Sequence, residues 1–237
     1  MRSVDRHRRD DALREANRSR RGTRGGGRTG ARVSSWLVVL PAALVLFLVL
    51  RTFVVEAFRI PSSSMERTLL VGDFLLVNKW VYGAQVPFTR TRLPALRTPR
   101  HNDVVVFDWP VDPAKAFVKR LVGLPGDTLS MMQGVLRRNG TPLRESYAFR
   151  GVATGGVYDT ILDARDSWGP LVVPPRHLFV LGDNRANSLD SRYWGFVPDS
   201  LLRGAPWFVY YSFTPDSTER APWLTRIRWD RLGTTVR

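Results

Sequence analysis

The sequence contains no cysteine, only three histidines and only three lysines among its 36 basic residues. The absence of cysteine excludes disulfide bonds, a thiol nucleophile and a cysteine-ligated zinc site. The histidines, at positions 7, 101 and 177, form no H-E-x-x-H motif, and no serine lies in a G-x-S-x-G elbow. A Ser-His-Asp triad is not excluded by counting, because its members meet only in space. No local pattern favours one.

The chain also lacks a charge within Val33–Leu50, a run of eighteen residues that is about long enough to cross a bilayer of roughly 30 Å. Apolar residues resume after Arg51, so we predict one transmembrane helix over residues 33–55. No A-x-A cleavage pattern follows it, which disfavours a cleaved secretory signal. A buried helix of a globular domain is the other alternative.

The formal charge of +15 raises nucleic acid and anionic membranes as partners. Much of this charge lies in residues 1–32, which hold eleven arginines against four acids and several glycines. Such a segment cannot bury a core, so we predict a disordered tail. By the positive-inside rule the tail is cytoplasmic, and the chain after about residue 52 is exported from the plasma membrane. No nucleic acid is needed to explain the charge.

Short apolar runs bounded by Gly, Pro and Asp dominate the exported part and predict strands. The runs are 74–77, 104–107, 117–122, 177–181 and 207–211. No segment here has sustained helical periodicity, so we predict a mainly β domain over residues 56–213. Residues 131–175 are expected to form an irregular insertion or small subdomain. Residues 214–237 are expected to lie on the membrane surface or to form a poorly ordered tail.

Lysine is the candidate base that remains, because arginine cannot give up its proton near neutral pH. Lys119 lies within the apolar run FVKRLV, where alternation places Phe117 and Leu121 on its own face. Burial there would lower its pKa. The alternative is a charged lysine on the solvent face of the strand. Lys79 and Lys115, in loop-like or edge settings, fit that alternative better.

Three separated blocks decide between these alternatives: IPSSSMERTLLVGDF at 60–74, KRLVGLPGD at 119–127 and GDNRANSLDSRYWGFVP at 182–198. Taken in this order behind one apolar segment, they resemble the bacterial type I signal peptidases, which use a Ser/Lys dyad. The resemblance covers about residues 36–212. It implies a membrane-bound serine endopeptidase that removes signal peptides from preproteins after small residues.

Residue by residue, the resemblance implies Ser64 as nucleophile and Lys119 as general base. Ser62 Oγ and the Ser64 N–H match the oxyanion hole, and Ser188 matches the residue that orients the lysine. The remaining matches are two structural ion pairs and three residues of the substrate pocket. These are Arg120 with Asp183, Asp190 with Arg192, and the pocket residues Phe58, Ile60 and Val118. No metal or cofactor is required, and the implied partners are preproteins, the lipid bilayer and the secretion machinery.

The sequence departs from the family pattern at two places. Glu66-Arg67-Thr68 stands where the family has any residue followed by Pro-Thr, and the missing proline could loosen the loop of Ser64. Ala186 stands where an acidic residue is common. Both departures put the rate and the pocket shape in question.

Three other classes of protein are alternatives. A self-cleaving repressor-type Ser/Lys protease would carry a DNA-binding domain in place of the tail and anchor. A penicillin-binding enzyme would show S-x-x-K, S-D-N and K-T-G motifs, which are absent. A catalytically inactive envelope protein that binds peptides is the remaining alternative.

Overall fold

The computed structural model describes residues 30–86, 89, 91–149, 165–215 and 218–236. The predicted tail lies outside the described residues as far as residue 29, and so do His7 and residues 150–164 of the predicted insertion. The chain divides into two compact units between Leu48 and Val49.

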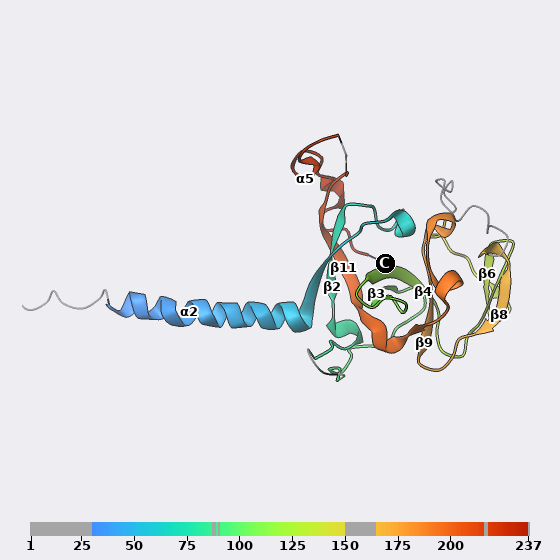
Figure 1. Cartoon of the computed structure of the whole chain (residues 1–237), viewed down its shortest axis with the longest axis horizontal. Helices are drawn as coiled ribbons and strands as arrows, with labels where there is room; N and C mark the ends of the chain where they lie inside the picture. Colours follow the sequence, from blue (N-terminus) through green and yellow to red (C-terminus); the bar gives the residue numbers. More distant parts are fainter. Residues whose placement is uncertain (1–29, 87–88, 90, 150–164, 216–217, 237) are drawn as a thin grey trace, which may run out of the picture. The chain divides into compact units, whose positions relative to one another are not determined.

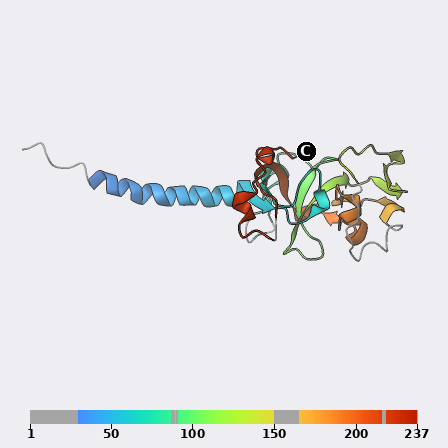
Figure 2. The same ribbon diagram turned by 90° about the horizontal axis from the view of Figure 1, so that it is seen from above.

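The first unit contains the helix α2 (Gly30–Val49), which continues through Pro41 without a sharp kink in both ribbon views (Figure 1, Figure 2). The helix begins slightly before the predicted start at residue 33, because helical hydrogen bonding is not confined to the apolar residues. The predicted end at residue 55 is wrong, because the regular α-helix ends at Val49 and Val55 is the first residue of a strand. No helix in the described part of the chain has both the length and the apolar content needed to cross a membrane.

The second unit is mainly β, as the sequence predicted, and it contains two sheets. A short π-helical turn, η1 (Leu50–Val54), leads into the first strand. The strands of the larger sheet are β1 (Val55–Arg59), β2 (Asp73–Asn78), β3 (Val104–Asp108), β4 (Ala116–Gly123), β9 (His177–Leu181), β10 (Val197–Pro198) and β11 (Leu202–Ser212). All five predicted apolar runs lie in strands of this sheet.

The larger sheet has the order β1-β2-β11-β3-β4-β9-β10, with antiparallel neighbours (Figure 1). Its central strands are covered on both faces. In β4, Val118 packs into one core cluster, whereas Leu121 and Phe117 pack into another. The predicted alternation of this strand is therefore confirmed. Because both faces of β4 are covered, the side chain of a lysine on this strand cannot point into bulk solvent.

The smaller sheet has the order β7-β6-β5-β8 and lies in sequence between β4 and β9. Its strands are β5 (Thr128–Met132), β6 (Val135–Arg138), β7 (Thr141–Pro142) and β8 (Trp168–Val172). Leu129, Met131 and Leu136 from this sheet share a core cluster with Phe179 and Leu181 of β9. The segment thus contains regular strands that its turn-rich sequence did not predict, whereas a separate subdomain over residues 131–175 stays a prediction.

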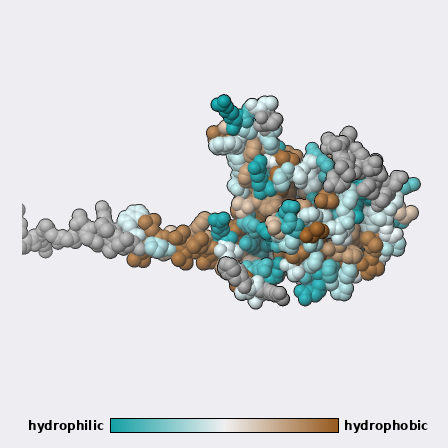
Figure 3. All heavy atoms as spheres, viewed as in Figure 1, coloured by the Kyte–Doolittle hydropathy of each residue, from teal (hydrophilic) through white to brown (hydrophobic). Residues whose placement is uncertain are grey.

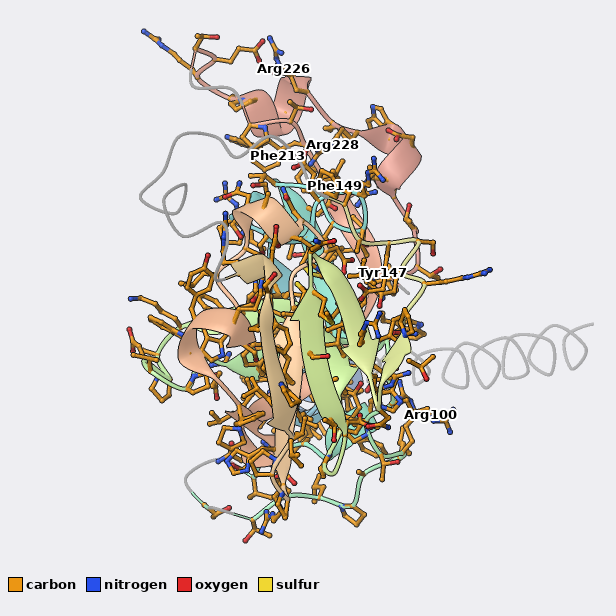
Figure 4. The ribbon with its side chains drawn as sticks, turned by 90° about the vertical axis from the view of Figure 1, so that its right-hand side faces the viewer. Arg100, Tyr147, Phe149, Phe213, Arg226 and Arg228 are labelled. Carbon is orange, nitrogen blue, oxygen red and sulfur yellow. The ribbon has the colours of Figure 1, made fainter. Side chains whose placement is uncertain are left out.

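The C-terminal segment packs back onto the second unit. It contains α5 (Pro222–Thr225) and η7 (Trp229–Arg231), and Val236 packs against the core. Bridges join Phe213 to Ile227 and Phe208 to Thr235. Figure 4 shows Phe213, Arg226 and Arg228 at the same end of the molecule.

Two arginines attach this segment to Asp73, the first residue of β2. The fully buried carboxylate of Asp73 accepts hydrogen bonds from Arg228, Arg231 and Ser212. The described C-terminal residues therefore belong to the folded unit, and the poorly ordered alternative does not apply to them.

Candidate active site

Ser64 is held by its neighbour Met65. The chain leaves β1, buries Ile60 and turns through a short 3-10 helix, η2 (Ser63–Met65). Met65 and Leu69 are 1% and 0% exposed and pack in the cluster that contains Val118 of β4. Methionine fills irregular gaps in a core, and the buried side chain of Met65 anchors the loop there. Because Ser64 directly precedes Met65, this anchor also fixes the position of the serine. Ser64 itself is buried beside the strand.

Lys119 reaches Ser64 from β4. Its side chain is 4% exposed, and its Nζ donates a hydrogen bond to Ser64 Oγ at 2.5 Å. The ammonium also lies 5.6 Å from the centre of the Phe117 ring, as expected for two residues on one face of a strand. The alternative of a charged lysine on the solvent face is therefore wrong.

The surroundings of Lys119 suit a base. Burial lowers the pKa of Lys119 to about 8, with Asp190 and Asp183 acting to raise it and Arg192 acting to lower it. Loss of water around the amine disfavours its charged form, which is the largest of these effects. A substantial fraction of the amine is neutral near pH 8, which is the state needed to accept a proton.

Ser62 lies next to Ser64, although not for the reason that the sequence suggested. Two serines spaced by two residues would share a face in an extended segment. Ser62 is extended, but the residues after it form the turn η2. The turn still brings the Oγ atoms of Ser62 and Ser64 to 3.4 Å. Both hydroxyls can thus face one substrate carbonyl.

Ser188 lies in the same cavity as Ser64 and Lys119. Burial acts to raise the pKa of Asp190, but the lowering effects, of which the charge of Arg192 is the largest, together outweigh it. The Ser188 hydroxyl contributes to this lowering. Among the described contacts Ser188 makes no hydrogen bond to Lys119 Nζ, so its predicted role in orienting the base stays a prediction. A side chain at Gly182 would come within 2.1 Å of Ser188 Oγ, which explains the glycine of the third block.

The first of two buried ion pairs connects the three sequence blocks. Arg120, next to Lys119 on β4, donates two hydrogen bonds to Asp183 at 2.8 and 2.7 Å. Thr68 Oγ1 donates to the same carboxylate at 2.6 Å. The loop that carries Ser64, the strand that carries Lys119 and the third sequence block therefore meet at Asp183.

The second pair lies within the third block. Arg192 donates two hydrogen bonds to Asp190, each of 2.8 Å, and both side chains are almost fully buried. Asp190 Oδ2 also accepts a hydrogen bond from the Gly182 N–H at 3.0 Å. Removing one member of such a pair would leave an uncompensated buried charge. Both pairs thus lie where the sequence placed them.

A cavity of about 300 Å³ opens beside Ser64. Phe58, Ile60 and Val118 line it, as the sequence predicted. Neither His101 nor His177 lines it. His101 instead lies 2.7 Å from Asp127, and His177 Nδ1 lies 2.9 Å from the carbonyl oxygen of Pro175. Within the described residues no cluster of three or more His, Asp or Glu side chains could hold a metal ion.

The departure at Glu66-Arg67 does not leave the nucleophile loop without support. Asn184 Nδ2 donates to Glu66 Oε2 at 3.2 Å, and the Asn184 N–H donates to the Ser64 carbonyl at 3.0 Å. The Arg67 guanidinium lies 4.6 Å from the centre of the Phe149 ring, a cation–π contact. These contacts hold the loop against neighbouring segments, and they restrict its motion where a proline would have restricted it through its fixed backbone angle.

The backbone of Arg67 has φ +77°, a value that proline cannot adopt. We therefore expect Arg67→Pro, the change that restores the family pattern, to destabilise the protein by more than about 1 kcal/mol. Arg67→Gly, which loses the same cation–π contact but tolerates positive φ, is the matched control and should cost less. Urea denaturation of both variants checks this, and an Arg67→Pro variant as stable as wild type would contradict the loop conformation.

Several residues of the site were not singled out from the sequence. Thr68, Asn184 and Asn187 lie within the first and third blocks, so the blocks were the signal that could have found them. Asn187 Nδ2 donates to Ser63 Oγ at 2.8 Å. Arg165, which also lines the cavity, lies outside every block and is one of many arginines.

Comparison with known proteins shows the family of the chain. A family model described as "Signal peptidase, peptidase S26" matches residues 33–211. The chain belongs to the signal peptidase family. It is 31% identical over 260 residues to the signal peptidase I of Buchnera aphidicola subsp. Baizongia pistaciae, covering 85% of this chain and 83% of that one.

Two further relatives are similarly close. The signal peptidase I of Pseudomonas aeruginosa is 35% identical over 211 residues, covering 78% of this chain and 74% of its own. The probable signal peptidase I-2 of a Synechocystis strain is 36% identical over 212 residues, covering 83% and 86%. The residues matched by the family model include both the loop of Ser64 and the third block.

Proposed function

We propose that this signal peptidase family member is a membrane-bound endopeptidase that removes signal peptides from preproteins with a Ser64/Lys119 dyad. The observation that carries the proposal is the 2.5 Å contact between Lys119 Nζ and Ser64 Oγ in a buried setting. A lysine pKa of about 8 supports it, because a general base works best when its pKa lies near the operating pH. The same contact disfavours an inactive peptide-binding protein, which has no need of a neutral lysine.

The reaction is acyl transfer in two halves. Neutral Lys119 takes the proton of Ser64, and the resulting alkoxide attacks the carbonyl carbon of the scissile bond. The oxyanion is stabilised by Ser62 Oγ and the Ser64 N–H. The C–N bond then breaks, and the Lys119 ammonium returns the proton to the departing amine. Lys119 next takes a proton from water, and the resulting hydroxide attacks the ester carbonyl. The bond between that carbon and Ser64 Oγ then breaks, the Lys119 ammonium returns the proton to Ser64 Oγ, and the signal peptide leaves with a free carboxylate.

The cavity residues Phe58, Ile60 and Val118 support selection of small side chains at −1 and −3. Ile60 and Val118 are 3% and 6% exposed, so the wall they form is fixed by core packing and cannot retreat from a large side chain. We expect a preprotein with Leu in place of Ala at −1 to be cleaved at least about tenfold more slowly. Side-by-side kcat/KM values measure this, and equal rates would contradict the pocket assignment.

The apolar segment supports a membrane location. The large apolar side chains described within α2, at Trp36 and between Val38 and Val49, are 45–69% exposed. Figure 3 shows the apolar surface of this helix. Exposed apolar surface of this extent needs an apolar environment. We propose residues 33–55 as the anchor, residues 1–32 as a cytoplasmic tail and residues 56–213 as the extracytoplasmic catalytic domain, with preproteins, lipid and the secretion machinery as partners.

The orientation follows from the arginines before the anchor. A reporter that is active only outside the cytoplasm should be active when fused after Arg237 and inactive when fused before Met1. A cytoplasmic C-terminal reporter would contradict the orientation, because the catalytic domain would then face the wrong compartment for exported substrates.

A further inference from the structure

Arg165 is a buried cation on the wall of the catalytic cavity. It is 4% exposed and lines the same cavity as Ser64 and Lys119. Its Nη1 donates a hydrogen bond to the carbonyl oxygen of Ala186 at 2.9 Å. Its Nη2 is also buried but has no hydrogen-bond partner among the residues described. Buried donors are normally satisfied, so this N–H group marks a place for an acceptor that a ligand supplies.

Within the described residues, the charge of Arg165 is also uncompensated. Three other arginines with buried side chains form ion pairs with acids: Arg120 with Asp183, Arg185 with Glu145 and Arg192 with Asp190. In the part of the chain that the structure describes, no carboxylate pairs with Arg165, and no Asp or Glu lines the cavity. A buried cation without a counter-charge favours binding of an anion.

The departure of this chain from the family pattern lies at the same place. Ala186, whose carbonyl accepts the hydrogen bond from Arg165, stands where an acidic residue is common in the family. The alanine side chain offers no carboxylate to the guanidinium, so the unpaired N–H donor of Arg165 is left for an acceptor on the substrate.

We infer that the Arg165 guanidinium lies close to the scissile bond, because Ala186, which accepts its hydrogen bond, lies close to Ser64. Ala186 lies in the short turn η5 (Arg185–Asn187). Two residues near Ala186 contact the serine run: Asn187, which follows it, donates from Nδ2 to Ser63 Oγ at 2.8 Å, and the N–H of Asn184, two residues before it, donates to the Ser64 carbonyl at 3.0 Å. A substrate residue within a few positions of the cleavage site is therefore within its reach.

We propose that Arg165 binds a carboxylate of the substrate through Nη2, so that this peptidase prefers preproteins with Asp or Glu close to the scissile bond. The inference rests on the proposed peptidase function. A charge-assisted hydrogen bond from a guanidinium to a carboxylate is about twice as strong as one to a neutral amide. Asp and Asn have nearly the same shape, so a comparison between them isolates the charge.

The test uses peptides with Ala at −1 and −3 that carry Asp, Asn or Lys at −2, +1 or +2 in turn. The full-length protein in detergent gives kcat/KM for each pair. Affinity of the same peptides for Ser64→Ala, measured by fluorescence anisotropy, gives a reading that does not need cleavage. Arg165→Gln removes the guanidinium, and Arg165→Glu reverses its charge. Arg176→Gln, at a side chain that is 80% exposed, is the matched control for net charge.

We expect Asp to be preferred over Asn by about tenfold at one of these positions in wild type and in Arg176→Gln. The preference should fall to near one in Arg165→Gln, and Arg165→Glu should prefer Lys over Asp at that position. Equal kcat/KM for Asp and Asn at all three positions in wild type would overturn the proposal without any variant. An Asp preference that survives in a folded Arg165→Gln would overturn it too. If no peptide is cleaved, the anisotropy ratios still decide the question, so failure of the peptidase is separable from failure of the carboxylate site.

Discussion

Replacing Lys119 with arginine should reduce kcat/KM for preprotein cleavage by at least about 10³-fold. The guanidinium keeps the positive charge and much of the length of the side chain. It cannot give up its proton at any pH at which the protein is folded, so Ser64 would lose its base. Lys119→Met, which removes the amine without burying a permanent charge, should lose a similar factor. Rates from peptide cleavage, with circular dichroism to verify folding, measure both.

Matched controls come from the only other lysines. Lys79 forms an ion pair with Glu56, and Lys115 forms one with Asp112; both lie outside the cavity. Lys79→Arg and Lys115→Arg should therefore keep rates within about threefold of wild type, because surface ion pairs contribute little. A Lys119→Arg variant that cleaves at near the wild-type rate would contradict the dyad.

The same base gives wild type a defined pH dependence. The active form of Lys119 is the neutral amine, whose fraction rises as pH increases through its pKa of about 8. The value of kcat/KM should therefore rise about tenfold per pH unit below that pKa and level off above it. A lysine exposed to water would place the inflection near 10.4 instead. An inflection at that higher value would show that the amine is not desolvated.

Replacing Ser62 with alanine should lower kcat by about 10²-fold and leave KM nearly unchanged. The Ser62 hydroxyl lies 3.4 Å from Ser64 Oγ, which places it beside the carbon that Ser64 attacks. Its hydrogen bond to the oxyanion forms only as negative charge develops, so its loss raises the barrier without weakening substrate binding. The Ser64 N–H remains as the second donor, which is why the variant should retain measurable activity.

Ser63→Ala is the matched control for Ser62→Ala, because it deletes the hydroxyl of the adjacent serine. Ser63 Oγ accepts a hydrogen bond from Asn187 and supports the loop from the other side. Loss of that bond should cost less than about tenfold. Steady-state kinetics of the two variants separates the roles. Equal losses, or a Ser62→Ala loss that appears only in KM, would contradict the oxyanion assignment.

Local apolar patterns predicted the strands of the larger sheet, whereas the pairing of Ser64 with Lys119 was implied by the family resemblance. The apolar run around Lys119 predicted a buried strand, and the structure places the lysine on β4 with Phe117 beside its amine. The resemblance predicted the pairing of Arg120 with Asp183, which are far apart in sequence. The third block, residues 182–198, is long enough that its resemblance to the family is specific.

Features that depend on contacts between distant segments were not predictable. The positive φ of Arg67 is compatible with a stable loop only because Phe149 and Asn184 lie against that loop. The attachment of Arg228 and Arg231 to Asp73 depends on packing of the C-terminal segment, whose sequence is as basic as that of a solvated tail. No single-residue propensity encodes such contacts.

The central claim, that Ser64 is the nucleophile activated by Lys119, is tested most directly by purified full-length protein acting on one preprotein. Wild type should cleave it at a single bond after a small residue, and Ser63→Ala should cleave the same bond. Ser64→Ala should leave the preprotein intact while remaining folded and binding it. Cleavage of that bond by Ser64→Ala at a rate comparable to wild type would contradict the account.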